Sequence, residues 1–416
     1  MEERLYTYRY RLYPDKEQTI HLSKLFGCCR LVYNHFLNEK QTQYKEIKSS
    51  DNYNTQQSKL TQLRKTEEYN FLNEMPLQVL QCSLRNMHTA FDRFYKHKGG
   101  YPNYKSKRDK QAFKISQPNT FHIKDNKLYI PKLKSGIKCV VSKELVGEPC
   151  FATVTKSKSG KYYVSITVKQ DNYVTYPHTN KSVGLDLGIK DLVITSDGVK
   201  YPRLKKQIKQ LKRKLKHNQR HLSRKQHGSK RYEKQVLKCN RIYEKITNVK
   251  VDYIHKITTE LVKQYDIIKV EDLNIKEMIK NHKLAEVINE CNWGEFVNML
   301  QYKCDWNNKQ LVKVDRFYPS SQICSKCGCR NKKLKSLNIR QWKCECCGIT
   351  HDRDVNAAIN ILNYNSVRNT EYSRGGVNKP DGTTCSTSDC LDSAKTIGKE
   401  AIIELEVYKT KRVDSE

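Results

Sequence analysis

Two cysteine pairs constrain this 416-residue chain more than any other feature of its sequence. They are Cys324-x-x-Cys327 and Cys344-x-x-Cys347, with sixteen residues between the pairs. Gly328 and Gly348 directly follow the pairs and give each turn backbone freedom. Four thiolates at this spacing complete the tetrahedron that Zn²⁺ prefers and leave no open coordination position. We therefore predict a four-cysteine zinc ribbon over residues 320–350 that holds one structural Zn²⁺.

Other cysteines leave some room for alternatives. Cys329 and Cys346 lie close enough to complicate the ligand assignment, although neither completes an equally symmetric pair. Incidental buried thiols are the competing interpretation. The 16 cysteines stand in a long chain without an export signal, so a secreted disulfide framework is not expected. This usage indicates a reducing compartment, and we expect the cytoplasm, in contact with DNA.

The charge balance indicates a polyanionic partner. The chain has 78 Lys and Arg against 44 Asp and Glu, a net charge of +34. Such an excess attracts nucleic acid and releases its counterions on binding. An anionic membrane is the alternative, but no long apolar run or amphipathic anchor supports it. We expect nucleic acid and no membrane; the oligomeric state is left open.

Nearly half of this charge falls in one segment. Residues 201–250 contain 18 Lys and Arg against two Glu, and Gly228 interrupts the run. Apolar side chains recur at helical spacing in its first half: Leu204, Ile208, Leu211 and Leu215. The pattern predicts a basic antiparallel helical pair. A solvated face is the ordinary interpretation of such a run, but its charge density favours a surface that meets phosphates.

The rest of the chain divides into segments of different pattern. Residues 1–20 begin as an alternating strand, residues 17–98 are mostly helical, and residues 103–178 are short strands of a small barrel or sandwich. Residues 181–319 have an α/β pattern that includes a helix at 283–306, and a final helix is expected at 351–365. Residues 366–416 lack a periodic core pattern, and we expect a disordered tail.

Three acidic residues far apart in the chain are candidates for one metal site. Asp186 lies among apolar residues in a strand, Glu271 ends another apolar strand, and Asp354 begins a helix whose alanines allow close packing on a sheet. Converging carboxylates repel one another unless divalent metal neutralises them. With two Mg²⁺ ions about 3.5–4 Å apart they would hydrolyse a phosphodiester. Taken singly, each acid has an ordinary structural alternative, and we assign Asp352 as a helix N-cap.

Several motifs together resemble one known family. They are YRLYP, FGCCRLVYNHFL, VGLDLGIKDLVITSDG, IIKVEDL, YPSSQICSKCG and WKCECCGITHDRDVNAAINI. In this order, over about residues 5–365, they resemble TnpB, the OrfB-type transposon-associated RNA-guided endonucleases related to miniature type V CRISPR effectors. The resemblance implies an α/β RNase H-like RuvC nuclease core at 181–319 with the zinc ribbon inserted. It also implies an α+β N-terminal half, residues 1–180, with a β-barrel wedge domain carrying an inserted helical recognition lobe.

The resemblance also implies roles for individual residues and partners. Asp186, Glu271 and Asp354 match the RuvC active site of the family, and the four cysteines match its zinc ligands. Tyr53 and Gln81 fall where the family reads a short element-adjacent DNA motif. The implied partners are a guide RNA from the transposon right end and double-stranded target DNA, with sequence read by base pairing.

Three functions are compatible with these features. The first is an RNA-guided, Mg²⁺-dependent DNA endonuclease that helps its insertion sequence to be retained. The second is an RNA-guided DNA-binding repressor, which an altered acid would have favoured. The third is a guide-free, structure-specific RuvC-type nuclease, against which the zinc insertion and the long N-terminal half both argue. A strand-joining transposase ranks last, because neither a DDE pattern nor an HUH motif is present.

Overall fold

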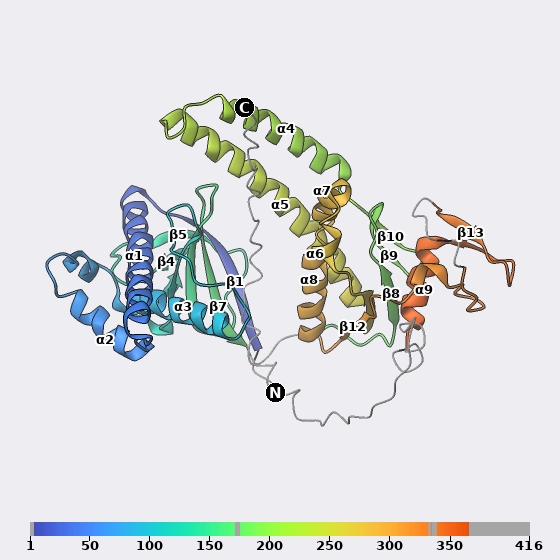
Figure 1. Cartoon of the computed structure of the whole chain (residues 1–416), viewed down its shortest axis with the longest axis horizontal. Helices are drawn as coiled ribbons and strands as arrows, with labels where there is room; N and C mark the ends of the chain where they lie inside the picture. Colours follow the sequence, from blue (N-terminus) through green and yellow to red (C-terminus); the bar gives the residue numbers. More distant parts are fainter. Residues whose placement is uncertain (1–3, 171–174, 332–333, 335–338, 366–416) are drawn as a thin grey trace, which may run out of the picture.

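The computed structural model describes residues 4–170, 175–331, 334 and 339–365 (Figure 1). A helix-covered N-terminal sheet and a second α/β body lie on opposite sides of the molecule, and a long helical hairpin lies above and between them. The predicted disordered tail, 366–416, falls outside the described residues. No described helix is long and apolar enough to cross a membrane.

The N-terminal body is a curled seven-stranded sheet with a helical insertion after its first strand. Its strands are β1 (Arg4–Tyr13), β2 (Gln111–Ile115), β3 (His122–Lys124), β4 (Lys127–Tyr129), β5 (Ile137–Val140), β6 (Glu148–Lys156) and β7 (Tyr162–Gln170). They run in the order β2-β6-β7-β1-β5-β4-β3, with antiparallel neighbours throughout. The prediction of short strands in this part of the chain is confirmed. β2 and β3 are the two end strands of the sheet, and the sheet is curled.

The inserted helices cover this sheet. They are α1 (Lys16–Ile47), α2 (Tyr53–Leu63) and α3 (Leu77–Tyr95), with the short 3₁₀ segment η1 (Asn70–Glu74) before α3 and η2 (Pro118–Thr120) later in the chain. Asp15 and Gln18 form a capping box at the start of α1, which satisfies two backbone N–H groups. Leu80, Leu84, Met87 and Phe91 recur at helical spacing along α3 and are buried, and the helix packs on α1. One continuous core therefore joins the helices to the sheet.

The second body is built on a five-stranded mixed sheet. Its strands are β8 (Ser182–Asp186), β9 (Asp191–Thr195), β10 (Lys200–Pro202), β11 (Ile267–Glu271) and β12 (Gln310–Val314), in the order β10-β9-β8-β11-β12. β8, β11 and β12 are parallel, and β9 returns antiparallel to β8, so that these two strands form a hairpin around Gly188. Its helices are α4 (Lys205–Ser223), α5 (Lys230–Gln264), α6 (Ile275–Met278), α7 (His282–Cys291), α8 (Trp293–Trp306) and α9 (Arg353–Asn363).

Alternation along the central strands decides which face carries the chemistry. Val183 and Leu185 of β8 belong to the core cluster that α5 and α8 share with the sheet. Gly184, between them, faces α9: a Cβ there would lie 2.1 Å from the Ala358 carbonyl oxygen. Only glycine therefore permits this approach. The next residue on the α9 face is Asp186.

Two helix predictions need correction or extension. The single helix expected over 283–306 is two helices, α7 and α8, because Asn292 adopts a left-handed conformation with φ of 52° between them. The basic helical pair is present as α4 and α5, held together by Ile208, Leu215, Cys239 and Ile246. However, α5 continues to Gln264, where its last turns become part of the core of the second body.

Candidate active site and metal centre

The sheet and α9 place the three predicted acids at one edge of the sheet, near enough for their charges to interact, although they do not form a group with all ligand atoms within 4.8 Å of one another as the cysteines do. Leu185 of β8 pairs with Val270 of β11 in parallel register, so Asp186 and Glu271 follow side by side at the carboxyl ends of adjacent strands. Asp354 lies in the first turn of α9, which packs on β8 at Gly184. All three side chains are partly buried. Neighbouring strand ends and one helix start thus place negative charge at one edge of the sheet.

The electrostatics of this group show a deficit of positive charge. Burial raises the pKa of Asp186 well above its usual range, and the charges of Glu271 and Asp354 raise it further. Burial also raises the pKa of Glu271, against the hydrogen bond from Ser320. Arg353 and Arg340 offset only part of the shift at Asp186. A divalent cation would remove this repulsion, and carboxylate oxygens are ligands that suit Mg²⁺.

Two neighbours of the acids were not predicted from the sequence. The Ser320 hydroxyl donates a 2.6 Å hydrogen bond to Glu271 Oε1. Arg340 Nη1 forms a 2.9 Å ion pair with Asp354 Oδ2. Both residues belong to the segment around the cysteine pairs, and neither stands in a pattern that indicates a role. Their positions depend on tertiary folding.

Three other acids near the candidate site, Asp352, Asp272 and Asp197, have partners of their own. Asp352 accepts hydrogen bonds from the backbone N–H groups of Asp354 and Val355, which confirms its assignment as the N-cap of α9. Asp272 forms a 3.0 Å ion pair with Arg316. Asp197 accepts a hydrogen bond from the Tyr265 hydroxyl. These acids thus cap or brace the fold.

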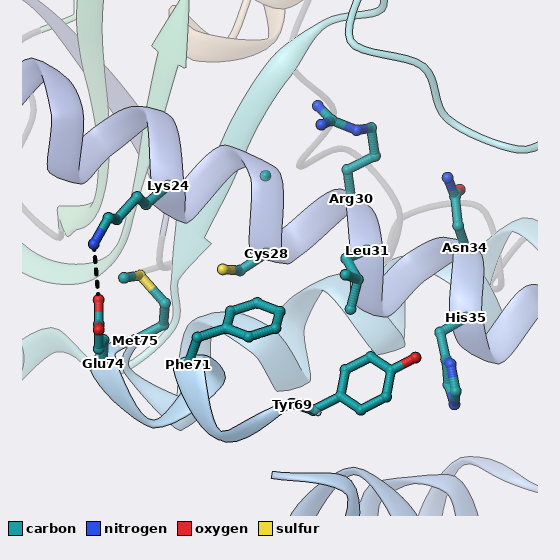
Figure 2. Close-up of a pocket in the computed structure, with 11 residues that line it drawn as sticks. Lys24, Cys28, Arg30, Leu31, Asn34, His35, Tyr69, Phe71, Glu74 and Met75 are labelled. Carbon is teal, nitrogen blue, oxygen red and sulfur yellow. Dashed lines mark hydrogen bonds and ion pairs between the residues drawn. The ribbon is translucent and has the colours of Figure 1, made fainter. Parts of the chain in front are cut away.

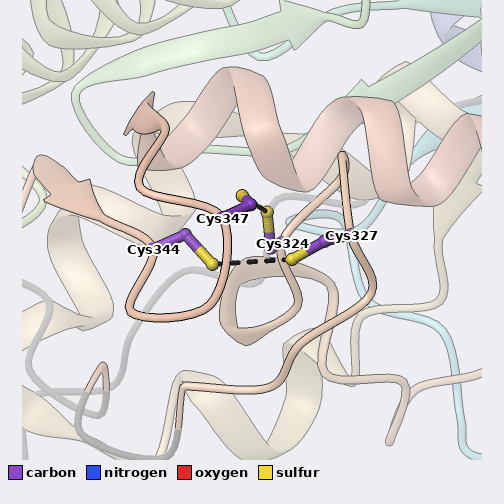
Figure 3. A group of neighbouring side chains, drawn as sticks. All are labelled: Cys324, Cys327, Cys344 and Cys347. Carbon is purple, nitrogen blue, oxygen red and sulfur yellow. Dashed lines mark hydrogen bonds between the residues drawn. The ribbon is translucent and has the colours of Figure 1, made fainter.

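The four predicted cysteines form one compact group (Figure 3). Cys324, Cys327, Cys344 and Cys347 have sulfur atoms that all lie within 4.8 Å of one another. The Cys324–Cys347 and Cys327–Cys344 sulfur pairs are each 3.6 Å apart. Backbone N–H groups of Cys347 and Cys346 lower the pKa of the Cys344 thiol to about 7. Four soft donors in this arrangement fit Zn²⁺.

Two further cysteines and a histidine lie beside this group. Cys329 and Cys346 also lie near Cys344, but they are bonded to each other as a disulfide. The His351 Nε2 atom lies 3.0 Å from the Cys324 sulfur, and its ring packs against Trp342 across the β13–β14 pair (Gln341–Lys343 and Thr350–Asp352). An imidazole in contact with one thiolate can fix the orientation of that ligand. No role for His351 was predicted from the sequence.

Helix α9 connects the cysteine group to the acids. The Asn356 side-chain amide donates to the Ile323 carbonyl and accepts from the Ser325 N–H, so it holds both sides of Cys324. Asn360, one turn later, donates to the carbonyls of Ile323 and Ser320, at 2.6 and 2.7 Å. Ser320 begins the 3₁₀ segment η3 (Ser320–Gln322) and is itself bonded to Glu271. The cysteine module and the acid edge are therefore one hydrogen-bonded unit.

The two residues predicted to read DNA lie in the helical lobe. Tyr53 starts α2, and its ring packs under the Arg85 guanidinium, 4.8 Å from the ring centre, and against His88 of α3. Gln81 is on α3, one turn before Arg85, and is half-buried. Both side chains thus belong to the α2–α3 part of the lobe, and their role stays a prediction.

Comparisons with known proteins agree with this architecture. Family models match residues 1–49 ("Helix-turn-helix domain"), 164–282 ("Probable transposase", OrfB of IS605) and 293–361 ("Cas12f1-like, TNB domain"). In the described part of the first range the structure is β1 followed by one long helix, α1. The Cas12f1 structure in the "Cas12f1-sgRNA-target DNA complex" covers 86% of this chain and 99% of its own length, with TM-score 0.52 and 14% identity. That similarity shows that the chain shares its fold with Cas12f1.

Two curated relatives define the family. A Streptomyces pristinaespiralis protein named "Putative RNA-guided DNA endonuclease" is 38% identical over 357 residues, 85% of this chain and 88% of the relative. "Putative RNA-guided DNA endonuclease InsQ" of Escherichia coli (strain K12) is 29% identical over 375 residues, 86% and 92% of the two chains. The chain belongs to the TnpB (OrfB-type) family of transposon-associated RNA-guided endonucleases.

Proposed function

We propose that the chain is an RNA-guided, Mg²⁺-dependent DNA endonuclease of an insertion sequence, which cuts next to a short element-adjacent motif and so aids transposon retention. The observation that carries the proposal is the carboxylate group at the edge of the sheet, whose charge Arg340 and Arg353 offset only in part. Glu271 and Asp354 raise the pKa of Asp186, so the three charges together are unfavourable without a cation, and such groups are typical of functional sites.

In this proposal Asp186, Glu271 and Asp354 are the catalytic residues of an RNase H-like RuvC core. Two bound Mg²⁺ ions would activate water and stabilise the leaving oxygen. The chain itself supplies the carboxylate oxygens, orients Glu271 through Ser320, and keeps Arg340 beside Asp354, where a phosphate would approach. The four cysteines would hold one structural Zn²⁺.

In the same proposal, the basic hairpin and the N-terminal half bind nucleic acid. The basic hairpin of α4 and α5 would bind phosphates of the guide RNA or the target. The N-terminal half would act as the wedge domain with its recognition lobe, and Tyr53 and Gln81 would contact the DNA motif. The names of the relatives, which include RNA guidance, support the proposed RNA partner.

The experiment that tests the proposal is expression of the protein together with its downstream element sequence, followed by purification and sequencing of any bound RNA. We expect one defined RNA, and a changed 3′ end should redirect Mg²⁺-dependent cutting to the matching DNA. Equal cutting by RNA-free protein would favour a guide-free nuclease. Guided binding without cutting would favour a repressor.

A further inference from the structure

The helical lobe contains a cavity that none of the predicted roles uses. It has a volume of about 860 Å³ and lies between α1 and the η1 segment (Figure 2). None of the acids or cysteines of the candidate site lines it, and neither do Tyr53 and Gln81. The cavity is therefore separate from the candidate active site and from the residues predicted to read DNA.

One wall of the cavity is aromatic. Tyr69 and Phe71 present their rings toward the side chains of α1 in Figure 2, with ring centres 6.3 Å apart. His35 of α1 contacts the Tyr69 ring edge-on at 5.6 Å. Phe71 is 44% exposed, although a phenylalanine gains most from burial. These rings form an open stacking surface.

Gly27 keeps the opposite wall open. It lies inside the 32-residue helix α1, where glycine is unfavourable compared with alanine. A Cβ at this position would meet no atom within 4 Å, so no packing contact requires glycine here. Because Gly27 lines the cavity, any longer side chain would project into it. The absence of a side chain at Gly27 therefore keeps this part of the cavity open.

Positive charge lies on the side of the cavity away from the aromatic rings, where the Arg30 guanidinium points in Figure 2 and donates a 3.4 Å hydrogen bond to Gln111. Arg30 lines this cavity and also a second, smaller one, whose other lining residues include Lys105, Lys110 and Lys114. The carboxylate of Glu74 in the first cavity is paired with Lys24 at 3.0 Å. The cavity therefore offers aromatic faces at one side and the Arg30 guanidinium at the other, and the three lysines line the second cavity that shares Arg30. Aromatic faces beside cations are the arrangement that binds single-stranded nucleic acid, because bases stack while phosphates pair with the cations.

We propose that this cavity binds one unpaired nucleotide, with its base against Tyr69 and Phe71 and its phosphates toward Arg30. The proposal rests on the proposed function only in requiring a nucleic-acid partner. An aromatic side chain of a protein partner would use the rings but not the neighbouring cations. The unpaired nucleotide can belong to RNA or to a displaced DNA strand, and the test separates these two sources.

The test is photo-cross-linking of the full chain to two 12-mers that carry one 5-iodouracil, one an RNA and one a DNA, with the labelled residues identified by mass spectrometry. We expect a cross-link at Tyr69 or Phe71. A stronger signal with the RNA would assign the cavity to RNA, and a stronger signal with the DNA would assign it to a DNA strand. Labelling confined to other parts of the chain would overturn the proposal.

Substitutions at Gly27 separate the cavity from the fold. Gly27→Met should reduce the cross-link at Tyr69 and Phe71 roughly tenfold or more, as expected when one stacked base is displaced. It should leave thermal stability equal or higher, because the glycine penalty is removed. Gly27→Ala, which fills little of the cavity, is the matched control for the helix. Tyr44→Ala removes an exposed aromatic ring of α1 outside the cavity and should change nothing.

The outcomes distinguish this proposal from the proposed function. Persistent cross-linking in a stable Gly27→Met variant would overturn the cavity assignment. A protein that cuts DNA under RNA guidance but never labels Tyr69 or Phe71 would refute only the cavity. A protein that labels them but does not cut would refute only the nuclease.

Discussion

The four-cysteine group and the three-carboxylate group both collect like charges, but they do so by different means. The cysteines come from one short segment, and spacing alone brings their sulfur atoms within 4.8 Å. The acids come from two strands and a helix that are distant in sequence and converge only where α9 packs over Gly184. A short sequence motif can thus contain all the ligands of a local metal site, whereas a site built from distant residues depends on the whole fold.

The comparison also shows that the two groups are not independent. Asn356 and Asn360 of α9 hold the backbone around Cys324, and Ser320 extends this network to Glu271. Loss of order in the cysteine module should therefore reach the acids. Loss of charge at the acids should leave the cysteine module intact, because its ligands are local.

The largest effect is expected from Cys344→Ser. Structural zinc sites of this kind supply about 10–16 kcal/mol of apparent binding free energy, so a chelator should remove zinc from the variant but not from the parent. Zinc content and thermal unfolding are the measurements. Cys150→Ser, a partly exposed cysteine of β6, is the control. Full zinc retention with unchanged stability would refute the four-cysteine assignment.

Asp186→Ala tests the other group. Removal of one carboxylate should lower the cleavage rate roughly 10³-fold or more, since metal-ion stabilisation of the transition state is worth several kcal/mol. Binding of nucleic acid and zinc content should remain near those of the parent. Asp191→Ala, in the same hairpin, should cut normally. If the two variants cut equally well, the acids are wrongly assigned.

The same contrast explains what the sequence could predict. Strands, helices and the cysteine site follow from local periodicity and spacing, and these predictions were largely correct. The break at Asn292 was missed because apolar residues continue at helical spacing through it. Ser320, Arg340, Asn356 and Asn360 were missed because a polar residue has no distinguishing pattern until the fold supplies its partner. The roles of Gly184 and Gly27 could not be predicted either, because they depend on which atoms surround each glycine in the fold.

Asn360→Ala tests the connection between the cysteine group and the carboxylate group. Its loss removes two buried hydrogen bonds, to Ile323 and Ser320, and should loosen Glu271 without removing any proposed ligand. Loss of such supporting contacts typically costs 10- to 100-fold in metal affinity or activity, so about tenfold more Mg²⁺ should be required for half-maximal cutting. Asn363→Ala, exposed at the end of the same helix, is the control. An unchanged Mg²⁺ requirement would show that the groups act separately.

The smallest effect is a gain in stability on neutralising Asp186. Its folded pKa is raised by burial and by the neighbouring acids, so its contribution to stability is present below its unfolded pKa of about 3.9 and is lost as pH rises through the folded value. Without divalent cation at pH 7.5, Asp186→Asn should therefore be more stable than the parent by about 0.5–2 kcal/mol, as is common when a functional charge is removed.

This gain should shrink as the pH falls toward 4, because the parent carboxyl then becomes protonated as well. Added Mg²⁺ should reverse the order, since it would stabilise only the protein that binds it. Thermal unfolding at several pH values, with and without Mg²⁺, measures both effects, and Asp305→Asn, an exposed acid of α8, is the control. A variant less stable than the parent in metal-free buffer at every pH would mean that Asp186 stabilises the fold. The carboxylate group would then not need a cation to relieve its charge, and in this respect it would differ from the cysteine group.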